Sequence, residues 1–142
     1  MDRRSFIKNC SGIAVTTSGF SSLLLGCQTI PSSKVTHLNT EENNQITVNK
    51  AVLNTDGVAI LQATTLKAPI YLQQQKNGQY VALLLSCTHQ QCTVSVTSNS
   101  LVCPCHGAKF DKQGKVLRGP SEKDLLALKL YEKDNDIVIS LP

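Results

Sequence analysis

Two short clusters of cysteine and histidine hold the side chains that could do metal chemistry. The segments Cys87–Cys92 (CTHQQC) and Cys103–Gly107 (CPCHG) contain four of the six cysteines and two of the three histidines. Soft thiolates and imidazoles at this density are typical ligands of zinc and of iron–sulfur clusters. The spacing predicts a metal site, and the residue types alone leave both metals open.

Length and charge restrict the remaining possibilities. The chain has 142 residues, 41% of them hydrophobic, which fits one globular domain with an N-terminal extension. Its formal charge of +4 is small, and the basic residues are scattered, so we expect no nucleic-acid partner. No nucleophile with a base and no pair of acids stands out, so catalysis by the chain alone is not expected.

The N-terminus resembles a twin-arginine export signal. Arg3 and Arg4 precede Phe6 and Lys8, and an uncharged run follows from 9 to 33. This run is rich in Ser, Thr and Gly, and is less apolar than a membrane span of about 20 residues. Asp2 departs from the Ser or Thr that is usual before the pair. The competing interpretation is a basic tail before an ordinary helix.

Cys27 closes the stretch Leu24-Leu25-Gly26-Cys27, which is similar to a bacterial lipobox. Acylation there would give two lipid chains, enough for stable membrane anchoring; the alternative is a lone thiol. We expect a signal segment over 1–27, a polar linker over 28–44 and a domain over 45–142. The expected location is the periplasmic side, anchored by lipidated Cys27 or by an uncleaved signal.

From about Val35 onward the pattern predicts an all-β domain, because short apolar runs alternate with Asn, Gly and Asp turn signals. The run 80–85 is apolar enough to predict a central strand. Hairpins are expected around 76–78 and 133–136, and one helical turn over 121–126. The other predicted strands cover 46–48, 58–62, 70–74, 128–132 and 137–141.

The two clusters resemble the ligand boxes of Rieske iron–sulfur proteins, specifically the disulfide-containing respiratory type. Further matches are Phe110-Asp111-x-x-Gly114-x-Val116 and Gly119-Pro120, the latter as in the family's proline loop beside the cluster. The resemblance covers roughly 80–141, and the preceding part from 35 is compatible by strand pattern alone. It implies an antiparallel β sandwich with a small cluster-binding subdomain at about 86–120.

The resemblance also implies roles for the boxes: Cys87 and Cys103 hold one iron of a 2Fe-2S cluster, and His89 and His106 hold the other. Neutral imidazoles in place of two thiolates stabilise the reduced form, giving potentials of about −150 to +300 mV in this class. The remaining pair, Cys92 and Cys105, would form a disulfide, which requires an oxidising compartment and so agrees with export.

Two competing interpretations of the boxes remain. Four cysteines and two histidines could build a tetrahedral zinc site in a binding module. The chain could also be a plain disulfide protein with incidental histidines. Pro104 between Cys103 and Cys105, with His106 adjacent, disfavours the second interpretation.

Departures from the family pattern indicate the role. Ala108 and Phe110 replace a Ser and a Tyr that are common in high-potential members, so two hydroxyl donors are missing and we expect a lower potential.

Gln90 and Gln91 replace Leu and Gly, which suits a quinol pocket less well. We therefore expect an exported one-electron carrier, or the electron-transfer subunit of a periplasmic oxidoreductase, whose partner is a cytochrome or oxidoreductase subunit. Gly107, Gly119 and Pro120 would allow this partner a close approach. The alternative is the iron–sulfur subunit of a quinol–cytochrome c reductase.

Overall fold

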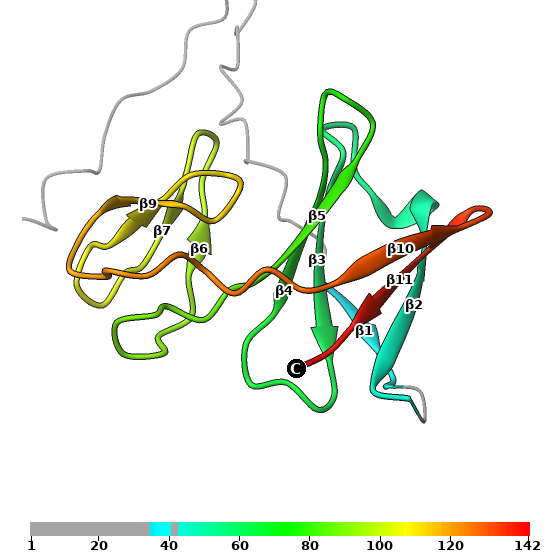
Figure 1. Cartoon of the computed structure of the whole chain (residues 1–142), viewed down its shortest axis with the longest axis horizontal. Helices are drawn as coiled ribbons and strands as arrows, with labels where there is room; N and C mark the ends of the chain where they lie inside the picture. Colours follow the sequence, from blue (N-terminus) through cyan, green and yellow to red (C-terminus); the bar gives the residue numbers. More distant parts are fainter. Residues whose placement is uncertain (1–34, 41–42) are drawn as a thin grey trace, which may run out of the picture. The chain divides into compact units, whose positions relative to one another are not determined.

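A computed structural model describes residues 35–40 and 43–142, and these form a nearly all-β structure (Figure 1). In these ranges no α-helix occurs, and one 3-10 turn, η2 (Lys50–Val52), follows the second strand. No helix of this part of the chain is long and apolar enough to cross a membrane. The predicted all-β class is confirmed. The export signal and Cys27 lie outside the described residues.

The strands form three sheets. The first contains, in spatial order, β1 (Val35–Leu38), β3 (Val58–Ala63), β4 (Ile70–Gln74) and β5 (Tyr80–Leu84). The second contains β10 (Leu130–Lys133), β11 (Asp136–Ser140) and β2 (Gln45–Asn49). The third contains β6 (Ser95–Val96), β7 (Leu101–Val102), β8 (Lys109–Phe110) and β9 (Val116–Arg118). The strand pairs are antiparallel except β1 and β3, which are parallel.

Strands β3, β4 and β5 of the first sheet are buried on both faces. In β4, Ile70 and Leu72 belong to a first core, which is shared with the second sheet. Tyr71 belongs to a second core, which is shared with the third sheet. Successive side chains of a strand point to opposite faces, so one strand can serve two cores. This explains why β3, β4 and β5 are mostly apolar. The first sheet lies between the other two (Figure 1).

The prediction that 80–85 forms a central strand is wrong, because β5 is the last strand of the first sheet. Extended chain covers its outer edge instead: the N–H of Leu84 donates to the carbonyl of Leu126 at 2.9 Å. The N–H of Leu128 donates to the carbonyl of Ala82 at 2.8 Å. With two covered faces and a covered edge, β5 is as apolar as a central strand.

The helical turn predicted over 121–126 is also wrong, since this segment contains no helix. Its backbone groups bond elsewhere: besides the contact with β5, the N–H of Leu125 donates to the carbonyl of Gly114 at 2.8 Å. The two predicted hairpins are confirmed, joining β4 to β5 and β10 to β11.

Strand β1 lies within the range 28–44 that is expected to form a polar linker. Its residues Val35–Leu38 pair with β3, and Leu38 packs against the first core. Residues 35–38 therefore belong to the first sheet. Apolar side chains within this largely polar stretch, such as Leu38, allow it to pack against the core.

Candidate metal centre

Two loops with the same backbone pattern present the predicted site residues. One loop follows β5 and the other joins β7 to β8. In each, the cysteine carbonyl accepts a bond from the residue four positions later, and the cysteine N–H donates to the residue five positions later. The bonds are Gln91 N–H to Cys87 (2.7 Å), Cys87 N–H to Cys92 (2.9 Å), Gly107 N–H to Cys103 (3.0 Å) and Cys103 N–H to Ala108 (2.8 Å). Cys87 and Cys103 therefore occupy equivalent positions in the two loops.

Both turns pass through the left-handed backbone region. Gly107 has a φ of 74° and Gln91 a φ of 56°. Glycine adopts this region without steric penalty, whereas glutamine is strained there. Gln91 stands where the respiratory type usually has Gly, so the loop keeps its conformation despite the substitution.

The four predicted ligands divide by burial. Cys87 and Cys103 are each 1% exposed and are free cysteines, whereas His89 and His106 lie on the surface. The two imidazole rings meet edge to face, with centroids 4.9 Å apart and an interplanar angle of 89°. The structure thus brings the two histidines together from separate loops, with the thiols beneath the surface.

A disulfide links Cys92 to Cys105 and joins the two loops, as the resemblance implies. The sulfur atoms of Cys92, Cys103 and Cys105 all lie within 4.8 Å of one another. The disulfide removes two of these sulfurs from metal binding, so they do not form a ligand set. The available donors are then two thiols and two imidazoles, which is the donor set that a Rieske 2Fe-2S cluster needs.

Hydrogen bonds prepare Cys87 to act as a thiolate. Burial alone would raise the pKa of this thiol, yet the pKa is lowered, because a hydrogen bond from Ser121 stabilises the thiolate. Backbone N–H groups of His89 and Gln90 and the side chain of Cys103 add to this lowering. The environment favours the charged sulfur that binds metal.

The turn at 111–114 explains the matched residues Phe110, Asp111 and Gly114. Oδ1 of Asp111 accepts from the N–H groups of Gln113 and Lys115, at 2.9 Å each. Gly114 has a φ of 86°, and a Cβ there would lie 2.9 Å from Cδ2 of Leu83 in β5. Asp111 therefore closes the turn, and Gly114 allows the turn to pack closely against β5 of the first sheet.

The other predicted residues around the site lie at two depths. Ala108 and Phe110 are fully buried in the second core, which also contains Cys87 and Cys103. Gln90, Gly119 and Pro120 are exposed, and the peptide bond between Gly119 and Pro120 is cis.

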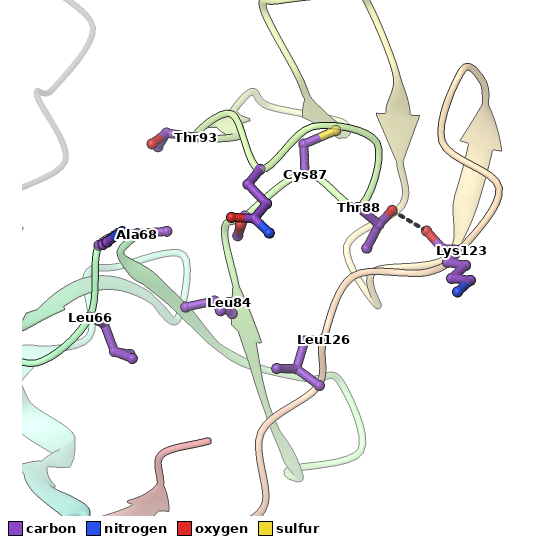
Figure 2. Close-up of a pocket in the computed structure, with 11 residues that line it drawn as sticks. Leu66, Ala68, Leu84, Cys87, Thr88, Thr93, Lys123 and Leu126 are labelled. Carbon is purple, nitrogen blue, oxygen red and sulfur yellow. Dashed lines mark hydrogen bonds between the residues drawn. The ribbon is translucent and has the colours of Figure 1, made fainter.

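A cavity of about 490 Å³ lies beside Cys87, between the first sheet and the loops (Figure 2). Figure 2 shows Leu84 and Leu126 on one side of it and Thr88 and Lys123 on the other, the latter two joined by a hydrogen bond. Its lining is Leu66, Lys67, Ala68, Leu84, Ser86, Cys87, Thr88, Gln91, Thr93, Lys123 and Leu126.

Three contacts at the site are not predicted from the sequence. Oγ of Ser121 lies 3.2 Å from Sγ of Cys87, and Oγ1 of Thr88 donates to the carbonyl of Lys123 at 2.6 Å. The guanidinium of Arg118 donates to the carbonyl of Gly107 at 3.0 Å. The position of Ser121 directly after Gly119-Pro120 is the one sequence signal that could have indicated its proximity.

Comparisons with known proteins agree with this arrangement. A model of the Rieske [2Fe-2S] domain matches residues 43–132. The cytochrome b6-f complex iron-sulfur subunit 2 of Trichormus variabilis is 31% identical over 99 residues, covering 67% of this chain and 56% of that protein. The corresponding subunit of Chlorobaculum tepidum is 36% identical over 66 residues, covering 45% of this chain and 36% of that protein. Among solved structures, the cyanobacterial plasma membrane Rieske protein PetC3 from Synechocystis PCC 6803 is 33% identical with a TM-score of 0.56, covering 66% of this chain and 95% of that one.

The structure is that of a small β protein with two free thiols and two imidazoles that could hold a metal cluster. The chain belongs to the Rieske [2Fe-2S] domain family, whose model matches more than half of it. Its cofactor is accordingly a Rieske 2Fe-2S cluster, and the chemistry that such a cluster supplies is one-electron transfer. Zinc and plain disulfide interpretations are thereby excluded. The chain spans 56% of the length of the b6-f subunit from Trichormus variabilis.

Proposed function

We propose that this chain passes single electrons between redox proteins through one Rieske 2Fe-2S cluster. Cys87 and Cys103 hold one iron, and His89 and His106 hold the other. The observation that carries the proposal is the pairing of two buried free thiols with two exposed, touching imidazoles. A cluster held this way is shielded on its thiolate side and reaches the surface through its histidines.

Exposure of the two histidines supports them as the electron exit. Gly119 and Pro120 are exposed as well and carry little side-chain bulk. The proposed partner is a cytochrome or another oxidoreductase subunit. Electron transfer between such proteins needs close approach of the two redox groups, and the exposed surface around the histidines allows it. The chain itself supplies no catalytic groups in this proposal.

Residues outside the described ranges support an exported, membrane-associated carrier. The twin-arginine-like segment 1–27 would direct export, and Cys27 would anchor the product on the periplasmic side. The Rieske domain in this proposal covers 45–142 together with strand β1, and its cluster-binding part covers 86–120. A disulfide between the ligand loops suits the oxidising compartment.

A second candidate function is the iron–sulfur subunit of a quinol-oxidising cytochrome complex. The names of the b6-f relatives favour it. Gln90 and Gln91 favour the small carrier, since polar side chains beside His89 fit an apolar quinol pocket poorly. Native gels of detergent-solubilised membranes separate the two: co-migration with a b-type cytochrome supports the subunit, and migration of a free protein supports the carrier.

Iron and acid-labile sulfide analysis tests the proposed function, together with voltammetry of the purified protein. We expect equal amounts of iron and sulfide and a reversible one-electron wave. Cys103→Ser should remove both. Bound zinc, iron without sulfide, or the absence of a reversible wave would contradict the proposal.

Hydroxyl groups restored at Ala108 and Phe110 should raise the midpoint potential. Ala108→Ser and Phe110→Tyr each add a donor in the core that holds the two thiols, and donors stabilise the added negative charge of the reduced cluster. Each change should favour reduction up to about tenfold, which is about 59 mV for a one-electron couple. Voltammetry measures the shift.

Ala59→Ser is the matched control, since Ala59 is 5% exposed and lies in the other core. It should leave the midpoint unchanged. A midpoint that stays constant in both Ala108→Ser and Phe110→Tyr would show that the missing hydroxyls do not set the potential.

A further inference from the structure

Ser121 is an unusual residue in its surroundings. In residues 35–40 and 43–142 it is 3% exposed, and no other buried position there holds a serine, threonine, amide or charged side chain. A buried hydroxyl without a hydrogen bond is unfavourable by about 1–3 kcal/mol. The hydroxyl of Ser121 lies 3.2 Å from Sγ of Cys87, which is its hydrogen-bond partner.

The direction of this hydrogen bond follows from the chemistry of sulfur. A neutral thiol could donate or accept, but a thiolate has no proton and can only accept. A cysteine that holds iron binds as the thiolate, and the proposed function makes Cys87 such a ligand. With Cys87 as a thiolate, Ser121 is the donor.

We infer that Ser121 tunes the reduction potential of the cluster by donating a hydrogen bond from Oγ to Sγ of Cys87. This inference rests on the proposed role of Cys87 as an iron ligand. An electron added to the cluster increases the negative charge on its cysteine sulfurs, so the bond is stronger in the reduced state and raises the potential. Ala108 and Phe110 supply no hydroxyl, and Ser121 supplies one from a different segment.

Ser121 could instead only fasten the segment after Pro120 to the first ligand loop. The structure offers a control for that role, because Thr88 and Lys123 join the same two segments through a 2.6 Å hydrogen bond (Figure 2). The Thr88 hydroxyl binds a backbone carbonyl and not a cysteine sulfur. Its removal therefore loosens the same contact without changing the donors to Cys87.

Ser121→Ala in the cluster-loaded full chain tests the inference by voltammetry. The equilibrium constant for reduction should fall about tenfold, a midpoint shift of about 59 mV to lower potential. Thr88→Val should leave the midpoint in place. Resonance Raman spectra should show iron–cysteine stretching bands that shift in deuterated water less in Ser121→Ala than in the wild type.

If Ser121→Ala loses the cluster, the isosteric variants Ser121→Thr and Ser121→Val provide the test. Their side chains have the same shape and differ only in a hydroxyl in place of a methyl group. The valine variant should have the lower midpoint. Equal midpoints within this pair, or an unchanged midpoint in Ser121→Ala, would overturn the inference. An equal fall in Thr88→Val would also overturn it, by showing that loop fastening is the cause. A wild type without a reversible couple would instead overturn the proposed function.

Discussion

Gly114→Ala is expected to destabilise the protein by about 2–5 kcal/mol, a fall in melting temperature on the order of 10–25 °C. Two effects add at this position. Its φ of 86° is unfavourable for alanine by about 1–2 kcal/mol. The new Cβ would also lie 2.9 Å from Leu83 Cδ2 and 3.3 Å from Leu125 Cβ, and such overpacking costs about 1–3 kcal/mol. Thermal unfolding followed by far-ultraviolet circular dichroism measures the loss.

Gly78→Ala separates the two effects. Gly78 has a φ of 85°, but nothing lies within 4 Å of the position that its Cβ would take. This variant should lose only the backbone contribution, about 1–2 kcal/mol. If both variants melted at the same temperature, the close contact between the turn and β5 would not hold the third sheet in place.

Removal of the disulfide is the second change with a large expected effect. The double variant Cys92→Ser, Cys105→Ser should lose about 3 kcal/mol, because the bond closes a loop with a sequence separation of 13. The bond also joins the loops that carry His89 and His106, so the cluster should be lost at a lower temperature. The temperature at which visible circular dichroism of the cluster disappears measures this effect.

Reductant provides the control for the disulfide. Wild-type protein treated with a phosphine reductant should approach the double variant, and the double variant itself should not respond. A double variant that keeps its cluster to the wild-type temperature would show that the ligand loops are held by other contacts, such as the second core.

The side chains that gather at the candidate site could be predicted from sequence because each box is local. Spacing within Cys87–Cys92 and Cys103–Gly107 fixes which side chains share a loop, and the resemblance supplied the pairing of Cys92 with Cys105 that the structure contains. The two hairpins could also be predicted from sequence, since the residues of a turn are contiguous in the chain.

Contacts between distant segments account for what the sequence did not reveal. An apolar run such as 80–85 shows that both faces are buried, and it does not show whether the neighbour at the edge is a regular strand or the extended segment around Leu126. Ser121 lies 34 positions after Cys87, so no local pattern links them. Hydroxyl groups are missing at Ala108 and Phe110, and in the inference above the hydroxyl of Ser121 offsets part of that loss.

The most direct test of the central claim, mixed cysteine and histidine ligation of one 2Fe-2S cluster, is the electron paramagnetic resonance spectrum of the dithionite-reduced protein. We predict a signal distinct from that of an all-cysteine cluster, with hyperfine coupling to nitrogen from His89 and His106 in the pulsed spectrum. A silent spectrum, or the signal of an all-cysteine cluster without this nitrogen coupling, would contradict the claim.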